Sequence, residues 1–269
     1  MKKVICLLQG CIAGALIILL LATVFLACSY HSNGDDVLPN MTITRIAELQ
    51  QRGDVHKACL DYLAYRLVSV QETTPDQLRQ TYDEWLLAQY GAPKADELRT
   101  ASAYDRERAE VYICKLAHNG KSELKGMAAS CPLSKRAVQT CLRGIVNILS
   151  EYEDEQIYDN ETVLQRIKAS ISANYQYFFS LCSDDPSRNQ MLYTLGTLYG
   201  SVEYWLCRDH VYQWFSLTHD ADEEMITQYR ASELTILLAG ADGYTAALCS
   251  PVMASVASAG IMIEMRCGE

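Results

Sequence analysis

The first 28 residues carry a different hydrophobic pattern from the rest of the chain. Two lysines at the start precede an apolar run over residues 4–27, in which Gln9 and Thr23 are the only polar interruptions. The part over residues 10–27 is by itself long enough for a helix that crosses a lipid bilayer. Such a start is typical both of an uncleaved membrane anchor and of a secretory signal that is removed on export, and both interpretations stay open.

After residue 40 the apolar positions recur at three- and four-residue spacing almost everywhere, which is the period of an amphipathic helix. We find no stretch with the period-two alternation of a strand, so the sequence predicts an all-α fold with about eight to ten helices behind the N-terminal segment. The clearest apolar face consists of Leu164, Ile167, Ile171, Tyr175, Phe178 and Cys182.

Local signals place the helix ends. Thr74, Pro75 and Gln77 form a capping box with proline at the first helical position, which predicts a helix up to about Tyr90. We expect Gly53 to separate two short helices, and the glycines of the 240–243 segment to end another. The expected helices cover 41–52, 54–70, 74–90, 93–119, 121–129, 134–152 and 164–182. Another begins at the break over 183–186 and carries an apolar stripe from Leu192 to Leu206, and the last two cover 220–240 and 251–267.

Composition divides the chain into three parts. Residues 1–28 form the signal or anchor, and residues 29–40, which are rich in Ser, Asn, Gly and Asp, predict a flexible tether. Residues 41–269 form the exported helical domain, with a candidate subdomain boundary in the acidic stretch at 153–160.

The segment Val24-Phe25-Leu26-Ala27-Cys28 resembles the lipobox of bacterial lipoproteins. In that family the cysteine thiol is acylated and cleavage makes the cysteine the new N-terminus. The resemblance implies that Cys28 is lipidated, and that Ser29 beside it directs the protein to the outer membrane rather than to an inner-membrane anchor. It covers this segment alone, but both interpretations of the leader place the remaining chain on the periplasmic side of a bacterial envelope.

The charge balance excludes one class of partner. Acids outnumber bases 33 to 23 in the 269 residues, so the net charge is −10, and all of the acids follow residue 28. Nucleic-acid binding is disfavoured because phosphate neutralisation needs clustered lysine and arginine.

Eleven cysteines are present, of which eight follow Cys28. An even number in an exported domain predicts disulfide bonds, with buried free thiols as the alternative. The connectivity is open, although Cys131 and Cys141 are the best local pair. Zinc is disfavoured because no two of these cysteines form a C-x-x-C and no histidine lies at ligand spacing. The disulfide candidates are Cys59, Cys114, Cys131, Cys141, Cys182, Cys207, Cys249 and Cys267.

An acidic stretch with interleaved tyrosines is the candidate surface for a basic protein partner. A solvated face that keeps the domain soluble is the simpler explanation. The candidate residues are Glu151, Tyr152, Glu153, Asp154, Glu155, Tyr158 and Asp159.

Catalytic patterns are missing from the sequence. Glu203, His210 and Trp214 share a predicted helical face with Asp209 nearby, but they match no known metal-binding or acid–base motif, and a structural histidine is favoured. Gly196 and Gly200 form a G-x-x-x-G that close helix packing explains better than ligand binding. We expect no catalytic site, no metal and no cofactor.

These observations favour a membrane-tethered, exported α-helical binding protein. Its most concrete form is an immunity-type protein that neutralises a toxin in the periplasm. The alternatives are an accessory subunit of an envelope secretion or conjugation machine, and an envelope enzyme built around the Glu203, Asp209 and His210 region.

Overall fold

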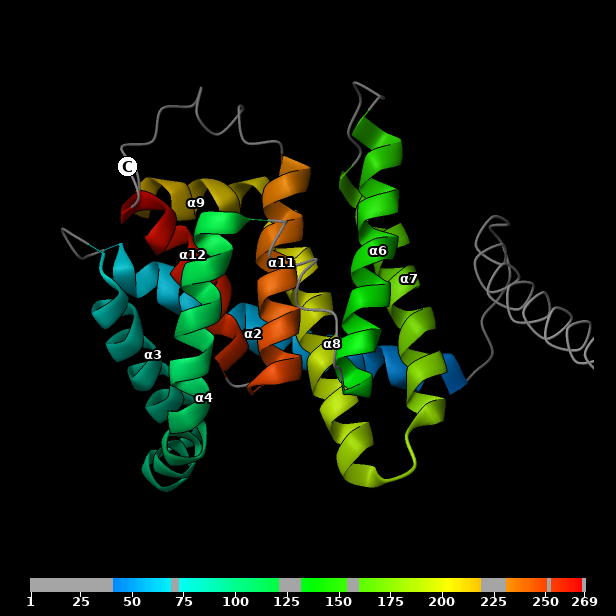
Figure 1. Cartoon of the computed structure of the whole chain (residues 1–269), viewed down its shortest axis with the longest axis horizontal. Helices are drawn as coiled ribbons and strands as arrows, with labels where there is room; N and C mark the ends of the chain where they lie inside the picture. The colour runs from blue at the N-terminus through cyan, green and yellow to red at the C-terminus, as the bar shows by residue number, and fades with distance from the viewer. Residues whose placement is uncertain are drawn as a thin grey trace, which may run out of the picture. The chain divides into compact units, whose positions relative to one another are not determined.

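The all-α prediction is confirmed. Figure 1 shows the computed structural model, which describes residues 41–68, 73–120, 132–153, 160–218, 231–250 and 253–267. All regular secondary structure in these ranges is helical, and Thr44–Glu269 is one compact unit. The described helices are α2 (Met41–Leu67), α3 (Pro75–Tyr90), α4 (Ala92–Asn119), α6 (Leu133–Glu153), α7 (Asn160–Leu181), α8 (Asp185–Trp205), α9 (Arg208–Thr218), α11 (Ala231–Leu248) and α12 (Ala254–Cys267).

Several predictions lie outside these ranges. They are the leader with Cys28, the tether at 29–40, the helix at 121–129, the start of a helix at 220 and most of the candidate boundary at 153–160. Among the helices that are described, none is both long and apolar enough to cross a membrane.

Two helices at the centre of the fold are buried on every side. Every side chain of α11 from Leu234 to Ala247 is buried, and so is every side chain from Met253 to Ile263 along α12. Figure 1 shows α11 between the α3–α4 pair and the α6–α7 pair. A helix that is apolar or small all round has no face for solvent, so these two helices form the core.

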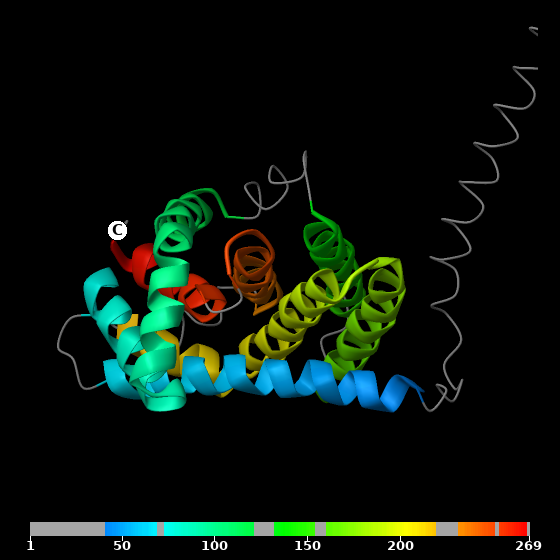
Figure 2. The same cartoon turned by 90° about the horizontal axis from the view of Figure 1, so that it is seen from below.

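Helix α2 runs across the other helices instead of beside them, as Figure 2 shows. It crosses α8 at Gly53, which lies against Gly196 and Gly200. A Cβ atom added to Gly200 would lie 2.4 Å from the carbonyl oxygen of Gly53. The two backbones are therefore in direct contact, which confirms that the G-x-x-x-G serves close helix packing.

Two predicted helix ends are wrong. α2 continues through Gly53, and α11 continues through the glycines of 240–243. A glycine inside a helix costs about 1 kcal/mol relative to alanine, and tertiary packing outweighs that cost at both places. At Gly243, for example, an added Cβ would lie 3.2 Å from a methyl carbon of Val138.

The boundaries set by local capping are confirmed. The Thr74 hydroxyl accepts the backbone N–H of Gln77, and the Gln77 side chain accepts the backbone N–H of Thr74. Gly91 and Gly120 follow the ends of α3 and α4 with φ angles of 74° and 52°, a region that L-residues rarely occupy.

The cysteines do not show the predicted disulfide stabilisation. Among the described residues, no disulfide bond is present at Cys59, Cys114, Cys141, Cys182 or Cys207. Cys59, Cys141 and Cys182 are buried, where a thiol packs as a small apolar side chain. Burial raises the pKa of Cys141 to about 12, so its reactive thiolate form is scarce at neutral pH. The suggested Cys131–Cys141 pair cannot be placed, because Cys131 lies outside the described residues.

We expect Gly200→Ala to lower the free energy of unfolding by at least about 2 kcal/mol, because the new methyl group meets a backbone that cannot rotate away. Gly144→Ala is the matched control, since its Cβ would meet only the Ser170 hydroxyl, a side-chain group that can turn aside. Urea unfolding followed by circular dichroism measures both variants. Equal stability of the two would contradict the backbone contact.

Candidate functional site

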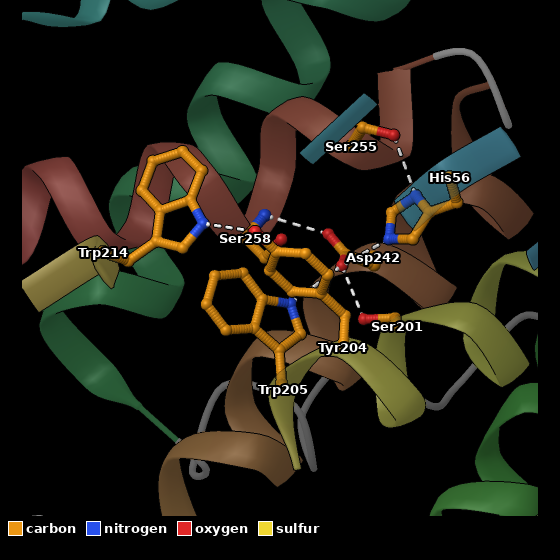
Figure 3. Close-up of polar contacts among 8 residues, drawn as sticks. All are labelled: His56, Ser201, Tyr204, Trp205, Trp214, Asp242, Ser255 and Ser258. Atoms are coloured by element: carbon orange, nitrogen blue, oxygen red, sulfur yellow. Dashed lines mark hydrogen bonds and ion pairs between the residues drawn. The ribbon is translucent and has the colours of Figure 1, made fainter. Parts of the chain in front are cut away.

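A buried polar cluster joins four helices in the centre of the fold. Figure 3 shows its main members: His56 of α2, Ser201 of α8, Asp242 of α11 and Ser255 of α12. None of these side chains is more than 4% exposed. A polar cluster at this depth is stable only if its donors and acceptors satisfy one another.

Both carboxylate oxygens of Asp242 accept hydrogen bonds. Oδ2 accepts the Ser201 hydroxyl at 2.6 Å, the His56 Nε2–H at 3.0 Å and the Trp205 indole N–H at 3.4 Å. Oδ1 accepts the backbone N–H of Ser258 at 2.9 Å. Asp242 is fully buried, and these donors replace the water that an ionised carboxylate would otherwise need.

The partners of His56 suit the neutral tautomer that carries hydrogen on Nε2. Because an ionised carboxylate can only accept, the Nε2 atom that faces Asp242 carries hydrogen. In the neutral ring Nδ1 is then an acceptor, and it receives the Ser255 hydroxyl at 2.8 Å. Cys59, one turn further along α2, also contacts the Ser255 hydroxyl. Burial raises the pKa of the Cys59 thiol well above its usual value, and the Ser255 contact opposes that rise only in part.

Ser255, His56 and Asp242 contain the residue types of a nucleophilic triad in hydrogen-bonded order. In serine hydrolases a serine is activated this way only where a substrate can reach it and where free N–H groups can stabilise an oxyanion. Here Ser255 is 4% exposed, and the nearby Ser258 N–H is already bound to Asp242. The arrangement is therefore suited to locking helices together, and we interpret it as structural.

A second polar chain leads from the interior to the surface. The Trp214 indole N–H donates to the Tyr204 hydroxyl at 3.0 Å, and that hydroxyl in turn donates to Asp61. Burial, with a smaller contribution from Asp61, raises the pKa of Tyr204 far above its usual value, which keeps the phenol protonated as a donor. His210 stacks on the Tyr204 ring and places its Nε2 atom 3.9 Å from Asp61. The contacts with Tyr204 and His210 therefore orient the exposed Asp61 carboxylate from its buried side.

A half-buried ion cluster lies between α2, α7 and α8. The Glu203 carboxylate accepts hydrogen bonds from the ammonium groups of Lys57 at 2.5 Å and Lys168 at 2.6 Å. The Lys57 ammonium group also pairs with the Asp54 carboxylate at 2.9 Å. Burial alone would raise the pKa of Glu203, but the hydrogen bonds from the two lysines outweigh it and hold that pKa below its usual value. The two cations are thus neutralised within the fold.

The structure separates the residues that the sequence suggested for an enzyme site. Glu203 is occupied by two lysines, whereas His210 contacts Tyr204 and Asp61, and Trp214 is buried. The shared face does not exist, because α8 ends at Trp205 and a new helix, α9, begins at Arg208.

Only part of the predicted acidic surface can be assessed. Arg166 of α7 donates to Glu151 at 2.7 Å and to the Tyr152 hydroxyl at 3.1 Å. These two candidates therefore connect α6 to α7 instead of standing free. The side chains of Glu153, Asp154, Glu155, Tyr158 and Asp159 lie outside the described residues.

Sequence reasoning missed the buried cluster because its members are remote along the chain. His56 is 186 residues from Asp242 and 199 from Ser255. One signal was available, since Asp242 is an acid within a helix that is otherwise apolar or small, and such an acid needs a partner. Within the described ranges, no group of three or more His, Cys, Asp or Glu side chains could hold a metal ion.

We expect Asp242→Asn to lower the free energy of unfolding by about 3 kcal/mol, because an amide cannot accept all of these buried donors. Asp209→Asn is the control on the exposed start of α9 and should change stability by less than about 0.5 kcal/mol. Urea unfolding of both variants tests this. A wild-type midpoint for Asp242→Asn would show that the cluster does not hold the helices.

Comparisons of the chain with known protein families, with curated proteins and with solved structures find no match. They assign no family and no activity. The functional argument therefore comes from the residues of the chain itself.

Proposed function

We propose that this chain is a membrane-tethered, exported α-helical binding protein of the bacterial envelope that acts by contact and not by catalysis. Its most concrete form is an immunity-type protein, an outer-membrane lipoprotein that faces the periplasm and occludes a toxin arriving there. The proposal rests on the leader of the sequence for location and on the surface of the helical domain for function.

The surface tyrosines are the observation that carries the functional part. In the described residues, every aromatic residue among the exposed large apolar side chains is a tyrosine. Tyrosine offers a large rigid ring and a polar hydroxyl, and it is enriched where proteins bind one another. These residues are Tyr65, Tyr90, Tyr177, Tyr193 and Tyr212.

The charge of the chain favours a basic partner. All 33 acids follow the leader, and an acidic surface attracts and orients a cationic protein while it repels anionic lipid and nucleic acid. Tethering near a membrane would hold such a protein where an incoming toxin must pass. No cofactor enters this proposal.

The location can be tested by mass spectrometry of the protein purified from the envelope. We expect the mature N-terminus to be acylated Cys28, and retained Met1 would show an uncleaved anchor instead.

Disulfide bonding of the exported domain also stays a prediction, because an oxidising compartment favours it. Alkylation under denaturing, non-reducing conditions counts the free thiols, and four or more would contradict disulfide stabilisation.

The function can be tested by gene deletion. We expect the deletion strain to be killed by a toxin-secreting sibling strain that the parent survives, and the full-length gene to restore survival. Survival equal to the parent against all sibling toxins would contradict the proposal. Stable co-purification with one envelope machine would favour the accessory-subunit alternative instead.

A further inference from the structure

The outer face of α2 presents a ridge of exposed side chains. Asp54, Ala58, Asp61, Tyr65 and Val68 follow one another at spacings of four and three residues, so they lie on one face, and all five are exposed. Figure 2 shows α2 running along one edge of the other coloured helices. We call these five residues the α2 ridge.

The ridge leaves apolar surface in water that the fold does not use. Tyr65 is 72% exposed, the highest value among the exposed large apolar side chains of the described residues, and Val68 is 58% exposed. Tyr212 of α9 is 46% exposed, and its helix contacts α2 through His210 and Asp61. Covering such side chains would remove apolar area from water, which favours association.

The cations of α2 are committed to other contacts. Among its described side chains, Arg52 lies over the Tyr193 ring at 4.1 Å, Lys57 bonds Asp54 and Glu203, and Arg66 bonds Glu84 at 2.8 Å. Among the described side chains of α2, these contacts leave no lysine or arginine beside Asp61, and the basic group nearest to it is His210 of α9, whose Nε2 atom lies 3.9 Å away.

Asp61 is both exposed and pre-oriented. Its side chain is 58% exposed, yet it accepts a hydrogen bond from the buried Tyr204, which Trp214 holds from behind. A carboxylate fixed in this way loses little conformational entropy when a cation binds it.

We infer that the α2 ridge is the contact surface for a basic helical segment of a partner protein. A lysine or arginine of that segment pairs with Asp61, and its apolar side chains cover Tyr65 and Val68. This inference rests on the proposed binding function and specifies its surface.

The probe for this surface is a fluorescein-labelled helical peptide of lysine and alanine with a stripe of two leucines. The full-length protein in phosphatidylcholine nanodiscs is titrated into the peptide, with empty nanodiscs as the lipid background. We expect the peptide to bind, and added salt to weaken the complex because an ion pair holds it. The same peptide with glutamate in place of lysine should not bind.

Three variants locate the binding. We expect Tyr65→Ala and Asp61→Asn each to weaken binding of the lysine peptide about tenfold, as for residues at the centre of an interface. Asp61→Asn keeps an acceptor for the Tyr204 hydroxyl, so it removes the charge and not the support. Tyr177→Ala is the control, because Tyr177 is also an exposed tyrosine, 60% exposed, but belongs to α7.

The inference would be overturned if the wild type failed to bind the lysine peptide, if both peptides bound equally, or if Tyr177→Ala weakened binding as much as Tyr65→Ala. The deletion strain separates this inference from the proposed function. If Tyr65→Ala and Asp61→Asn both protect as fully as the wild-type gene, the ridge is wrong and the function stands. If deletion has no effect on survival, the function is wrong, and the peptide titration still decides the ridge.

Discussion

The buried carboxylate of Asp242 is the interaction on which the arrangement of the central helices depends. It places a charge in the middle of α11, where every neighbouring side chain is buried, and the donors that stabilise it come from α2, α8 and α12. A buried charge is costly unless each of its acceptor sites is used. A packing in which one of these helices is displaced would leave the carboxylate underbonded, so the cluster favours a single arrangement over its near alternatives.

The glycine contact between α2 and α8 makes this cluster possible. His56 lies three residues after Gly53, and Ser201 directly follows Gly200. The backbones touch at the two glycines, and this brings the His56 ring and the Ser201 hydroxyl to the same oxygen of Asp242. A side chain at the crossing would separate the helices and withdraw His56 from the carboxylate. The glycine crossing and the polar cluster around Asp242 therefore depend on each other.

Features that depend on a few neighbouring residues could be predicted from the sequence. Features that depend on contacts between distant segments could not. The Thr74 capping box, the ends at Gly91 and Gly120 and the all-α class follow from local rules. Gly53 and the glycines of α11 are misread, because their helices continue only when other helices pack against them. The enzyme site suggested around His210 assumed one continuous helix, and the break after Trp205 removes that assumption.

The two candidate binding surfaces, the acidic stretch and the α2 ridge, also depend on contacts between distant segments. Glu151 and Tyr152 are acidic and aromatic, as an interface requires, but Arg166 from the next helix engages both. Asp61 and Tyr65 carry no distinctive motif, and only the course of α2 across the other helices shows that they are exposed together.

The wide separation of His56 from Ser255 has a consequence for the order in which the molecule can be completed. A ribosome releases the N-terminal helix first, and the last helix emerges 199 residues after His56. Until then the imidazole lacks the Ser255 hydroxyl, and α2 lies across a core that is missing α12. The first of the described helices is thus among the last to have all of its contacts, and a chain that stops before α12 lacks the segment that completes the core.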